Sequence, residues 1–268
     1  MNNNTGIYET TLKNGVRSYR VSITYRRKHI SLGSFCSCEK AKQVYSEARK
    51  IIDMNTITPE DYSDDLALPH DKFISIVNLK NNGLYFHTPI YLRKQYFEYY
   101  LRPEQILKFD RDDLFFYSAH KIQQRGGYLF VSDYGSQYKI LGRYGIKPFA
   151  VYGRDYIMIN GDRNDYRYSN IRILNNYTGV LQEGNSYTAL IHINGNYIIG
   201  RYASEITAAI AYNKAVDTLH ANGFTKAYLK NYIVSLSKDD YLKLYNSISI
   251  SPKLAQLTSP DSAKLIPD

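Results

Sequence analysis

An internal repeat is the feature that most constrains the fold of this 268-residue chain. Residues 178–224 follow the pattern of residues 5–53, with a residue deleted in the second hairpin. A segment repeated as a whole indicates one supersecondary unit that is present twice. The paired positions are Gly6 with Gly179, Tyr19 with Tyr187, Val21 with Ala189, Ile23 with Ile191, Gly33 with Gly200, Phe35 with Tyr202, Ser37 with Ser204, and Ala41, Tyr45 and Ala48 with Ala208, Tyr212 and Ala215. We therefore expect two copies of one small domain, with an unrelated region between them.

Each copy predicts three short strands followed by one helix. In the first copy, Ser18–Tyr25 alternates between apolar and polar residues, as a half-buried strand does. Asn14 and Gly15 predict the turn before it, and Ser37 can cap the helix that follows. The predicted elements are strands at Gly6–Tyr8, Ser18–Tyr25 and His29–Phe35 and a helix from about Cys38 to Ile52. The apolar residues of this helix recur at helical spacing, so it has one face that can cover a sheet.

The first copy also resembles a known DNA-binding domain. Its order of strand, strand, L-G-x-F and S-x-E-x-A-x-x-x-Y-x-x-A is similar to the APETALA2-type domains of plant ethylene-response factors. The residues that carry the resemblance are Leu32, Gly33, Phe35, Ser37, Glu39, Ala41, Tyr45 and Ala48. In that family a three-stranded sheet lies in the major groove. The resemblance therefore implies sequence-specific binding to double-stranded DNA.

Carried over to this chain, the resemblance implies a DNA-contacting sheet face in each copy. In the first copy this face comprises Arg17, Arg20, Ser22, Thr24, His29 and Ser31, and the loop residues Arg26, Arg27 and Lys28 would meet phosphates. In the second copy the corresponding residues are Thr188, Leu190, His192, Asn194, Asn196 and Ile198. The alternative for the basic loop is a solvated hairpin without a ligand.

Charge separates the two copies. The chain has 34 basic and 25 acidic residues, for a net charge of +9. Residues 1–57 hold ten basic and four acidic residues, whereas residues 176–232 hold four and three. Because a basic surface favours a polyanionic partner, we expect the first copy to be the main reader of DNA. Leu190 and Ile198 of the second copy would contact thymine methyl groups or another protein surface.

The middle region contains a second motif, between Tyr156 and Leu174. It holds Ile-Asn-Gly-Asp-Arg at residues 159–163, followed by Asp165, Arg167, Asn170, Ile171 and Arg172. This spacing resembles the core of HNH endonucleases of the homing type, in which the pattern is V-D-H-I-N-G-D-R-x-D-N-R-x-x-N-L-R. The family's metal-binding Asp falls on Ile157, its general-base His falls on Met158, and a further polar position is close to Tyr166. Neither an alkyl group nor a thioether can take a proton from water or hold a hard divalent cation.

The resemblance thus implies an HNH scaffold that has lost its chemistry, with no catalytic residue, metal or cofactor. It would contact the minor groove or phosphates through Arg154, Arg163, Arg167 and Arg172. Two alternatives stay open. The motif is also compatible with an ordinary turn followed by a short helix that Ser169 or Asn170 caps. It is compatible, too, with a working nuclease whose rearranged site uses Asp155, Asp162, Asp165 and His120.

The remaining segments complete an α+β organisation. Residues 58–104 predict a helical connector, in which dense Tyr and Phe residues are expected to pack as a core rather than to stack on bases. A helix is expected near Ser237 or Asp239, and the proline-containing end of the chain is expected to be mobile or an arm for assembly. The expected domains are residues 1–57 and 176–232 as the APETALA2-like pair, 58–104 as the connector, 105–175 as the degenerate HNH-like domain, and 233–268 as the C-terminal helix and tail.

Composition narrows the class of protein. No run of about 18 apolar residues exists that would span a membrane, and the N-terminus lacks the apolar region of a signal peptide. Cys36 and Cys38 are too close for a disulfide framework and too few for a metal site. The 28 Tyr residues and absence of Trp fit AT-rich codons, so we expect a cytoplasmic protein of a low-GC bacterium or its phage.

The function expected from these features is a transcriptional regulator, a repressor, of a phage or mobile element, derived from an HNH homing endonuclease. The alternatives are an active, metal-dependent nicking endonuclease and a protein-binding inhibitor. The protein would form a homodimer or bind a protein partner through the second copy or the C-terminal tail.

Overall fold

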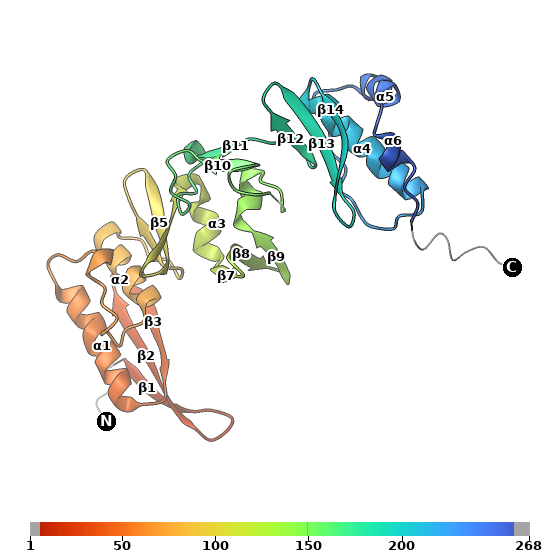
Figure 1. The fold of residues 1–268 in the computed structure, drawn as a ribbon. Coiled ribbons are helices and arrows are strands. Elements are labelled where there is room, and N and C mark those ends of the chain that lie inside the picture. The colour runs from red at the N-terminus through yellow and green to blue at the C-terminus, as the bar shows by residue number, and fades with distance from the viewer. Residues whose placement is uncertain (1–5, 149, 260–268) are drawn as a thin grey trace. The chain divides into compact units, whose positions relative to one another are not determined.

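The computed structural model describes residues 6–148 and 150–259 of a mixed α+β protein (Figure 1). The strands of this part form four three-stranded antiparallel sheets and one two-stranded sheet. The chain divides into two compact units, one of Met1–Tyr144 with Met158–Ile171 and the other of Gly145–Ile157 with Arg172–Asp268. The expected α+β class is therefore confirmed.

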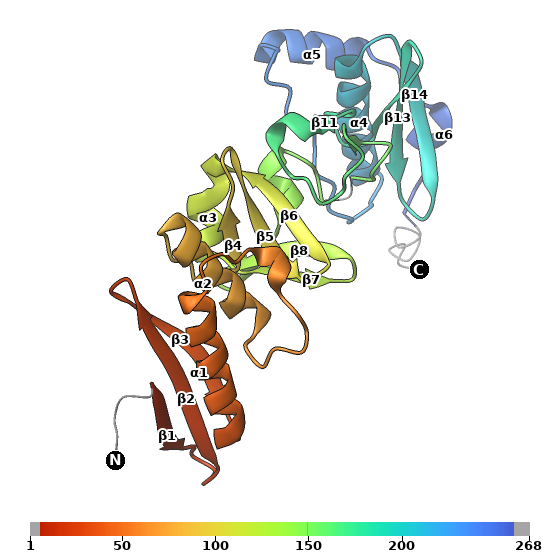
Figure 2. The same cartoon turned by 90° about the vertical axis from the view of Figure 1, so that its left-hand side faces the viewer.

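The first copy of the repeat forms a sheet that is covered on one face by a helix (Figure 2). β1 (Ile7–Thr11), β2 (Arg17–Tyr25) and β3 (Lys28–Phe35) pair in that order, and α1 (Cys38–Asp53) follows. The Ser37 hydroxyl accepts a hydrogen bond from the Lys40 N–H at 3.3 Å, so the expected cap is confirmed. The core between sheet and helix consists of Val21, Ile23, Ile30, Leu32, Ala41, Val44 and Ala48.

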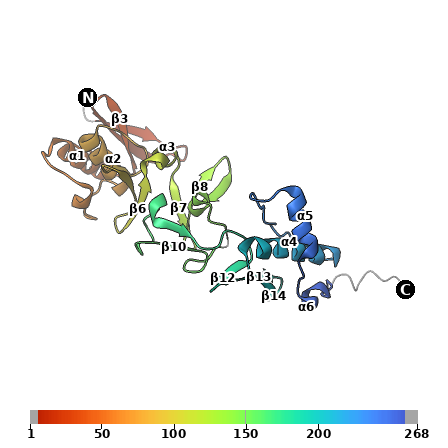
Figure 3. The ribbon, with the colours of Figure 1, turned by 90° about the horizontal axis from the view of Figure 1, so that it is seen from above.

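The second copy forms the same elements, with α4 (Glu205–Ala221) against one face of its sheet (Figure 3). Its strands are β12 (Val180–Glu183), β13 (Ser186–His192) and β14 (Asn196–Tyr202). The register shifts after Ala189 in β13 as it does after Val21 in β2, and Tyr187 pairs with Tyr202 as Tyr19 pairs with Phe35. The expected sequence repeat is thus confirmed as a repeat of structure.

One glycine has the same role at the start of both copies. Gly6 and Gly179 have φ angles of +62° and +71°, a region that favours glycine. Their carbonyl oxygens accept hydrogen bonds from the N–H groups of Ser22 at 2.8 Å and Leu190 at 2.7 Å. A Cβ atom at either position would lie only 2.2 Å or 2.4 Å from the carbonyl oxygen of the same partner. The close approach to the second strand therefore requires glycine in each copy.

The residues after α1 extend the core of the first copy. α2 (His70–Asn82) buries Phe73 and Ile76 in the same cluster as the first sheet. β4 (Ile90–Leu92), β5 (Tyr96–Arg102) and β6 (Gln105–Asp110) then form a sheet in that order. The boundaries expected at 57/58 and 104/105 therefore fall inside packed structure, because the buried face of α2 and the β5–β6 pairing cross them.

The aromatic residues of this region pack as a core, as expected. Phe97, Phe109 and Tyr117 are fully buried, and the ring centroids of Phe97 and Phe109 lie 5.4 Å apart. The elements that follow are α3 (Leu114–Ala119), β7 (Ile122–Arg125), β8 (Tyr128–Asp133) and β9 (Ser136–Lys139), with β7, β8 and β9 forming a further sheet in that order. β10 (Tyr156–Met158) and β11 (Ile171–Ile173) form the two-stranded sheet.

The C-terminal region is more ordered than expected. α5 (Lys238–Ser247) is capped by the Ser237 hydroxyl, which accepts from the Asp240 N–H at 3.2 Å and confirms the predicted helix start. α6 (Pro252–Ala255) buries Leu254 in the core of the second copy, and the Asn222 amide donates to the Leu257 carbonyl at 2.8 Å. The expectation of a mobile stretch is therefore wrong for residues 251–259, and residues 260–268 lie outside the described residues. No helix in the described part of the chain is long and apolar enough to cross a membrane.

Candidate nucleic-acid interface

The face of the first sheet that α1 leaves uncovered is polar and centred on Arg20. Arg20 in β2 pairs with Tyr8 in β1 and with Ser34 in β3, so these three side chains share one face. Tyr8 and Arg20 are exposed, and Arg20 forms no ion pair with any described residue. Of the other residues assigned to this face from the sequence, Thr24, His29 and Ser31 are exposed and Ser22 is buried.

Arg17 lies on the opposite side of β2 from Arg20, and its assignment to the DNA-contacting face needs correcting. Alternate residues of a strand share a face, so Arg17 belongs with Tyr19 and the buried Val21. Its guanidinium lies 3.5 Å from the carboxylate of Glu9, which pairs with Tyr19. Arg17 therefore stands at the edge of the helix-covered face.

The basic residues of the hairpin between β2 and β3 differ in their contacts. Arg26 and Arg27 have φ angles of +47° and +62°, as in a type I′ turn, which favours Asn and Gly. The Arg26 guanidinium donates to the Leu79 carbonyl in the last turn of α2 at 3.2 Å, where a cation is favourable. Arg26 thus has a structural role that the sequence analysis did not foresee. Arg27 and Lys28 are exposed and form no ion pair within the described part of the chain.

The corresponding face of the second sheet is built from side chains that pair with one another. Thr188 stands where Arg20 stands in the first copy, and its buried hydroxyl donates to the Glu183 carboxylate at 2.8 Å. Arg201 lies 3.7 Å from the same carboxylate. Among the other predicted DNA contacts, a ring nitrogen of His192 lies 3.0 Å from the Asn196 side-chain oxygen, and the Asn194 side chain accepts a hydrogen bond from the Tyr197 hydroxyl at 3.3 Å. Leu190 and Ile198 pair with each other and are apolar. This face therefore lacks the unpaired cation that its counterpart presents.

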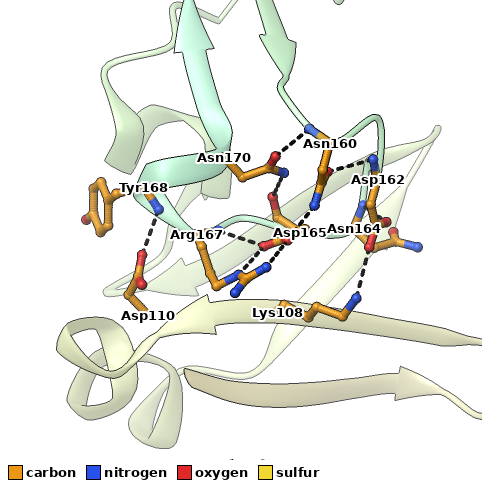
Figure 4. A network of polar contacts seen from close by, with 9 residues as sticks. All are labelled: Lys108, Asp110, Asn160, Asp162, Asn164, Asp165, Arg167, Tyr168 and Asn170. Atoms are coloured by element: carbon orange, nitrogen blue, oxygen red, sulfur yellow. Dashed lines mark hydrogen bonds and ion pairs between the residues drawn. The ribbon is translucent and has the colours of Figure 1, made fainter. Parts of the chain in front are cut away.

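The stretch that resembles an HNH core folds around one buried carboxylate, that of Asp165 (Figure 4). Asp165 is 0% exposed and accepts hydrogen bonds from the Arg167 side chain at 2.8 and 2.6 Å and from the Asn160 amide at 2.9 Å. Burial opposes ionisation, but these hydrogen bonds and the Arg167 charge hold the pKa of Asp165 below its ordinary value. The Asn170 amide donates to the Asp165 carbonyl and accepts from the Asn160 N–H, each at 2.8 Å. The residues that match the HNH pattern thus hold the turn in shape.

Residues distant in sequence fasten this turn to β6. The Lys108 ammonium donates to the Asp162 carboxylate at 3.1 Å, and the Asp110 carboxylate accepts from the Tyr168 N–H at 2.6 Å. The hydrogen bond to Asp162 raises the pKa of Lys108. Sequence reasoning missed both partners in β6, because no local pattern relates residues 54 or 58 positions apart.

The four arginines predicted to contact DNA in this region are not equivalent. Arg167 is paired with Asp165, and Arg154 lies 2.6 Å from the Asp155 carboxylate. Arg163 and Arg172 are exposed. Two belong to each compact unit, with Arg163 and Arg167 in the first and Arg154 and Arg172 in the second.

The positions that carry chemistry in HNH enzymes are apolar here. Met158 is buried and Ile157 is half-buried in β10. The carboxylates of the alternative nuclease are paired separately, Asp155 with Arg154, Asp162 with Lys108 and Asp165 with Arg167, while His120 lies 3.6 Å from Asp133. Among the described residues, no group of three or more His, Cys, Asp or Glu side chains could hold a metal ion. Within the first compact unit, Asp162, Asp165 and His120 thus each interact with a different partner.

Comparison of the chain with protein-family models, with curated proteins and with solved structures gives no match. The assignment of a function depends on the residues of the chain itself. Tyr8 and Ser34, which flank Arg20, were missed at the sequence level. The antiparallel order of the three strands was the signal that could have found them, because it places one side chain on each side of Arg20.

Proposed function

We propose that this protein binds double-stranded DNA at specific sequences and acts as a transcriptional repressor of phage or mobile-element origin. On this proposal residues 1–57 and 176–232 are APETALA2-like domains. The stretch Tyr156–Leu174 descends from an HNH homing endonuclease that has lost its catalytic residues.

The observation that supports this proposal most is the face of the first sheet that α1 leaves uncovered. At its centre lies Arg20, which forms no ion pair with any described residue. Strands can lie in a DNA groove, and an arginine fork can donate to O6 and N7 of guanine. Arg27 and Lys28 at the hairpin tip would meet phosphates, which position a protein without reading sequence. On this proposal the face around Arg20 reads bases and the hairpin tip contacts the DNA backbone.

The apolar residues Ile157 and Met158 support binding without cleavage. In the HNH pattern these positions supply the metal ligand and the general base. A protein that keeps the DNA-reading modules and lacks both groups occupies its site without cutting it. Occupancy of this kind is how a repressor acts.

Affinity selection from random duplex DNA, with and without Mg²⁺ or Mn²⁺, tests the proposal. We expect one sequence class to be enriched and no strand breaks to appear with either metal. Arg20→Ala should cost about 1–3 kcal/mol of binding free energy and relax one base position, as the loss of a bidentate guanine contact does. Arg17→Ala is the matched control, because the same residue type in the same strand lies on the other face.

Three results would contradict the proposal. Failure to enrich any sequence would remove DNA binding, and equal losses from Arg17→Ala and Arg20→Ala would remove the assigned face. Metal-dependent nicking that Asp155→Ala or His120→Ala abolishes would establish a nuclease instead. His192→Ala, in the second copy, should have a much smaller effect than Arg20→Ala because it removes no unpaired cation.

A further inference from the structure

The β7–β8–β9 sheet has two unlike faces. Ile122 and Val131 pair on one face and are buried, and the Ile122 N–H donates to the Tyr99 hydroxyl at 3.0 Å. We call the other face the open face. It consists of cross-strand partners: Arg125 pairs with Tyr128, Phe130 pairs with Gln123 and Lys139, and Ser132 pairs with Gln137. Phe130 at the centre of this face is only 6% exposed and Lys139 is half-buried, whereas the other side chains of the face are exposed. The face therefore presents polar and cationic side chains and the exposed ring of Tyr128 around a buried ring.

Cations and carboxamides surround these rings, and no carboxylate lies on the open face. The Lys139 ammonium is 4.0 Å from the Tyr128 ring centroid, and the Arg125 guanidinium is 5.8 Å from that of Phe130. Asp133, the acidic residue of β8, alternates to the other face, where it lies 3.6 Å from His120. A surface with positive charge, amide donors and an exposed ring matches a ligand with phosphates and flat heterocycles.

The tip of the β8–β9 hairpin carries an aromatic residue in an unfavourable conformation. The β7–β8 turn uses Gly126 and Gly127 at φ angles of +54° and +81°, whereas the β8–β9 turn uses Tyr134 and Gly135 at +45° and +82°. A left-handed backbone is uncommon for a bulky residue, and Asn or Gly would be favoured at this position. The Tyr134 side chain is 101% exposed, so no contact within the described part of the chain compensates for this conformation.

We propose that the open face of the β7–β8–β9 sheet is a further DNA-binding surface. Arg125 on this face meets phosphates, and the ring of Tyr134 at the adjoining hairpin tip stacks on a base at a deformed or unpaired step of the duplex. The proposal rests on the proposed function, because it requires that the protein binds double-stranded DNA. Stacking on an aromatic ring tolerates any base, so this contact adds affinity and deforms the duplex without reading its sequence.

Three variants separate this role from the stability of the sheet. Tyr134→Asn places a residue that tolerates the left-handed conformation at the turn, so the hairpin should fold at least as well. Tyr128→Ser and Tyr138→Ser form a matched pair, because the two rings are 57% and 56% exposed on opposite faces. The probe is the duplex that the wild-type protein selects, with 2-aminopurine placed at successive positions.

We expect 2-aminopurine fluorescence to change at one step when the wild-type protein binds, and this change to be absent with Tyr134→Asn. Affinity should fall at least about fivefold for Tyr134→Asn, as loss of a stacked base does, and should fall for Tyr128→Ser but not for Tyr138→Ser. Wild-type behaviour of Tyr134→Asn would overturn the inference and leave the proposed function intact, and so would equal losses from Tyr128→Ser and Tyr138→Ser. If the wild-type protein selects no duplex, the proposed function fails and the inference fails with it.

Discussion

At the residue scale, the arginines of the first sheet differ in what their donors already contact. Arg17 pairs with Glu9, Arg26 donates to the carboxyl end of α2, and Arg20 and Arg27 have no ion-pair partner among the described residues. Net charge alone did not distinguish them. The number of unengaged donors on one face is the better guide to where a polyanion would bind.

The Arg27→Gly substitution is expected to stabilise the protein and, under the proposed function, to weaken binding to DNA. Arg27 has a φ of +62°, and a non-glycine residue in this region costs roughly 1–2 kcal/mol. Removing one phosphate contact should lower affinity for all sequences and reduce the slope of log K against log salt by about one. Urea denaturation and salt-dependent binding measure the two effects. An unchanged salt slope would show that Arg27 does not contact a phosphate.

The Asp165→Asn substitution should cost roughly 3 kcal/mol of unfolding free energy at neutral pH, because it leaves Arg167 without its buried carboxylate. The pKa of Asp165 is lowered in the folded state, so this carboxyl contributes stability above its unfolded pKa. That contribution is lost as pH falls through the lower, folded pKa. Stability of the wild-type protein should therefore decline below about pH 4 more steeply than that of Asp165→Asn.

The Asp162→Asn substitution is the control for Asp165. Its ion pair with Lys108 has side chains that are 37% and 33% exposed, and such pairs contribute only about 0–1 kcal/mol. Denaturant titration at several pH values compares the two variants. Equal losses of unfolding free energy would mean that Asp165 contributes no more to stability than Asp162 does in the network of Figure 4.

At the element scale, a glycine before the first strand of each copy lies close to the backbone of the second strand. Gly6→Ala should destabilise the first copy by roughly 2–5 kcal/mol, because the left-handed φ costs about 1–2 kcal/mol and crowding against Ser22 costs about 1–3 kcal/mol. Gly15→Ala is the matched control, since Gly15 has a φ of +80° but no atom lies within 4 Å of an added Cβ. Thermal denaturation should rank the two variants in that order. A smaller loss from Gly6→Ala than from Gly15→Ala would show that the close approach is not limiting.

At the scale of the whole molecule, the proposed function and the two unequal copies of the repeat together predict a composite DNA site. A single small domain buries only about 600–1,000 Å² on DNA, and a second linked domain adds affinity through effective concentration. Inserting about five base pairs between the two sequence elements rotates one of them by half a helical turn. We expect affinity to fall toward that of the first copy alone.

Binding of duplexes with graded spacers by the full chain measures this effect. Affinity that is indifferent to the spacer would show that the second copy does not read DNA. Its outward Leu190 and Ile198 would then be explained better as an interface with another protein.

The sequence by itself determined the repeated unit. The strands and helix of the first copy, the cap at Ser37 and the matching elements of the second copy follow from turns, capping groups and side-chain alternation. These features depend on contacts between residues a few positions apart, or between adjacent strands joined by short turns, so the chain records them locally. The same alternation also places Arg17 opposite Arg20, which the comparison with a known family obscured.

Only the tertiary structure decided which polar groups remain available. Arg26 reaches Leu79 at a separation of 53 residues, Lys108 reaches Asp162 at 54, and Asn222 reaches Leu257 at 35. It also placed the β5–β6 hairpin across an expected boundary and gave the β7–β8–β9 sheet its open face. Each of these outcomes depends on which distant segments share a core, and a side chain's partner there is set by packing geometry that no short stretch of sequence encodes.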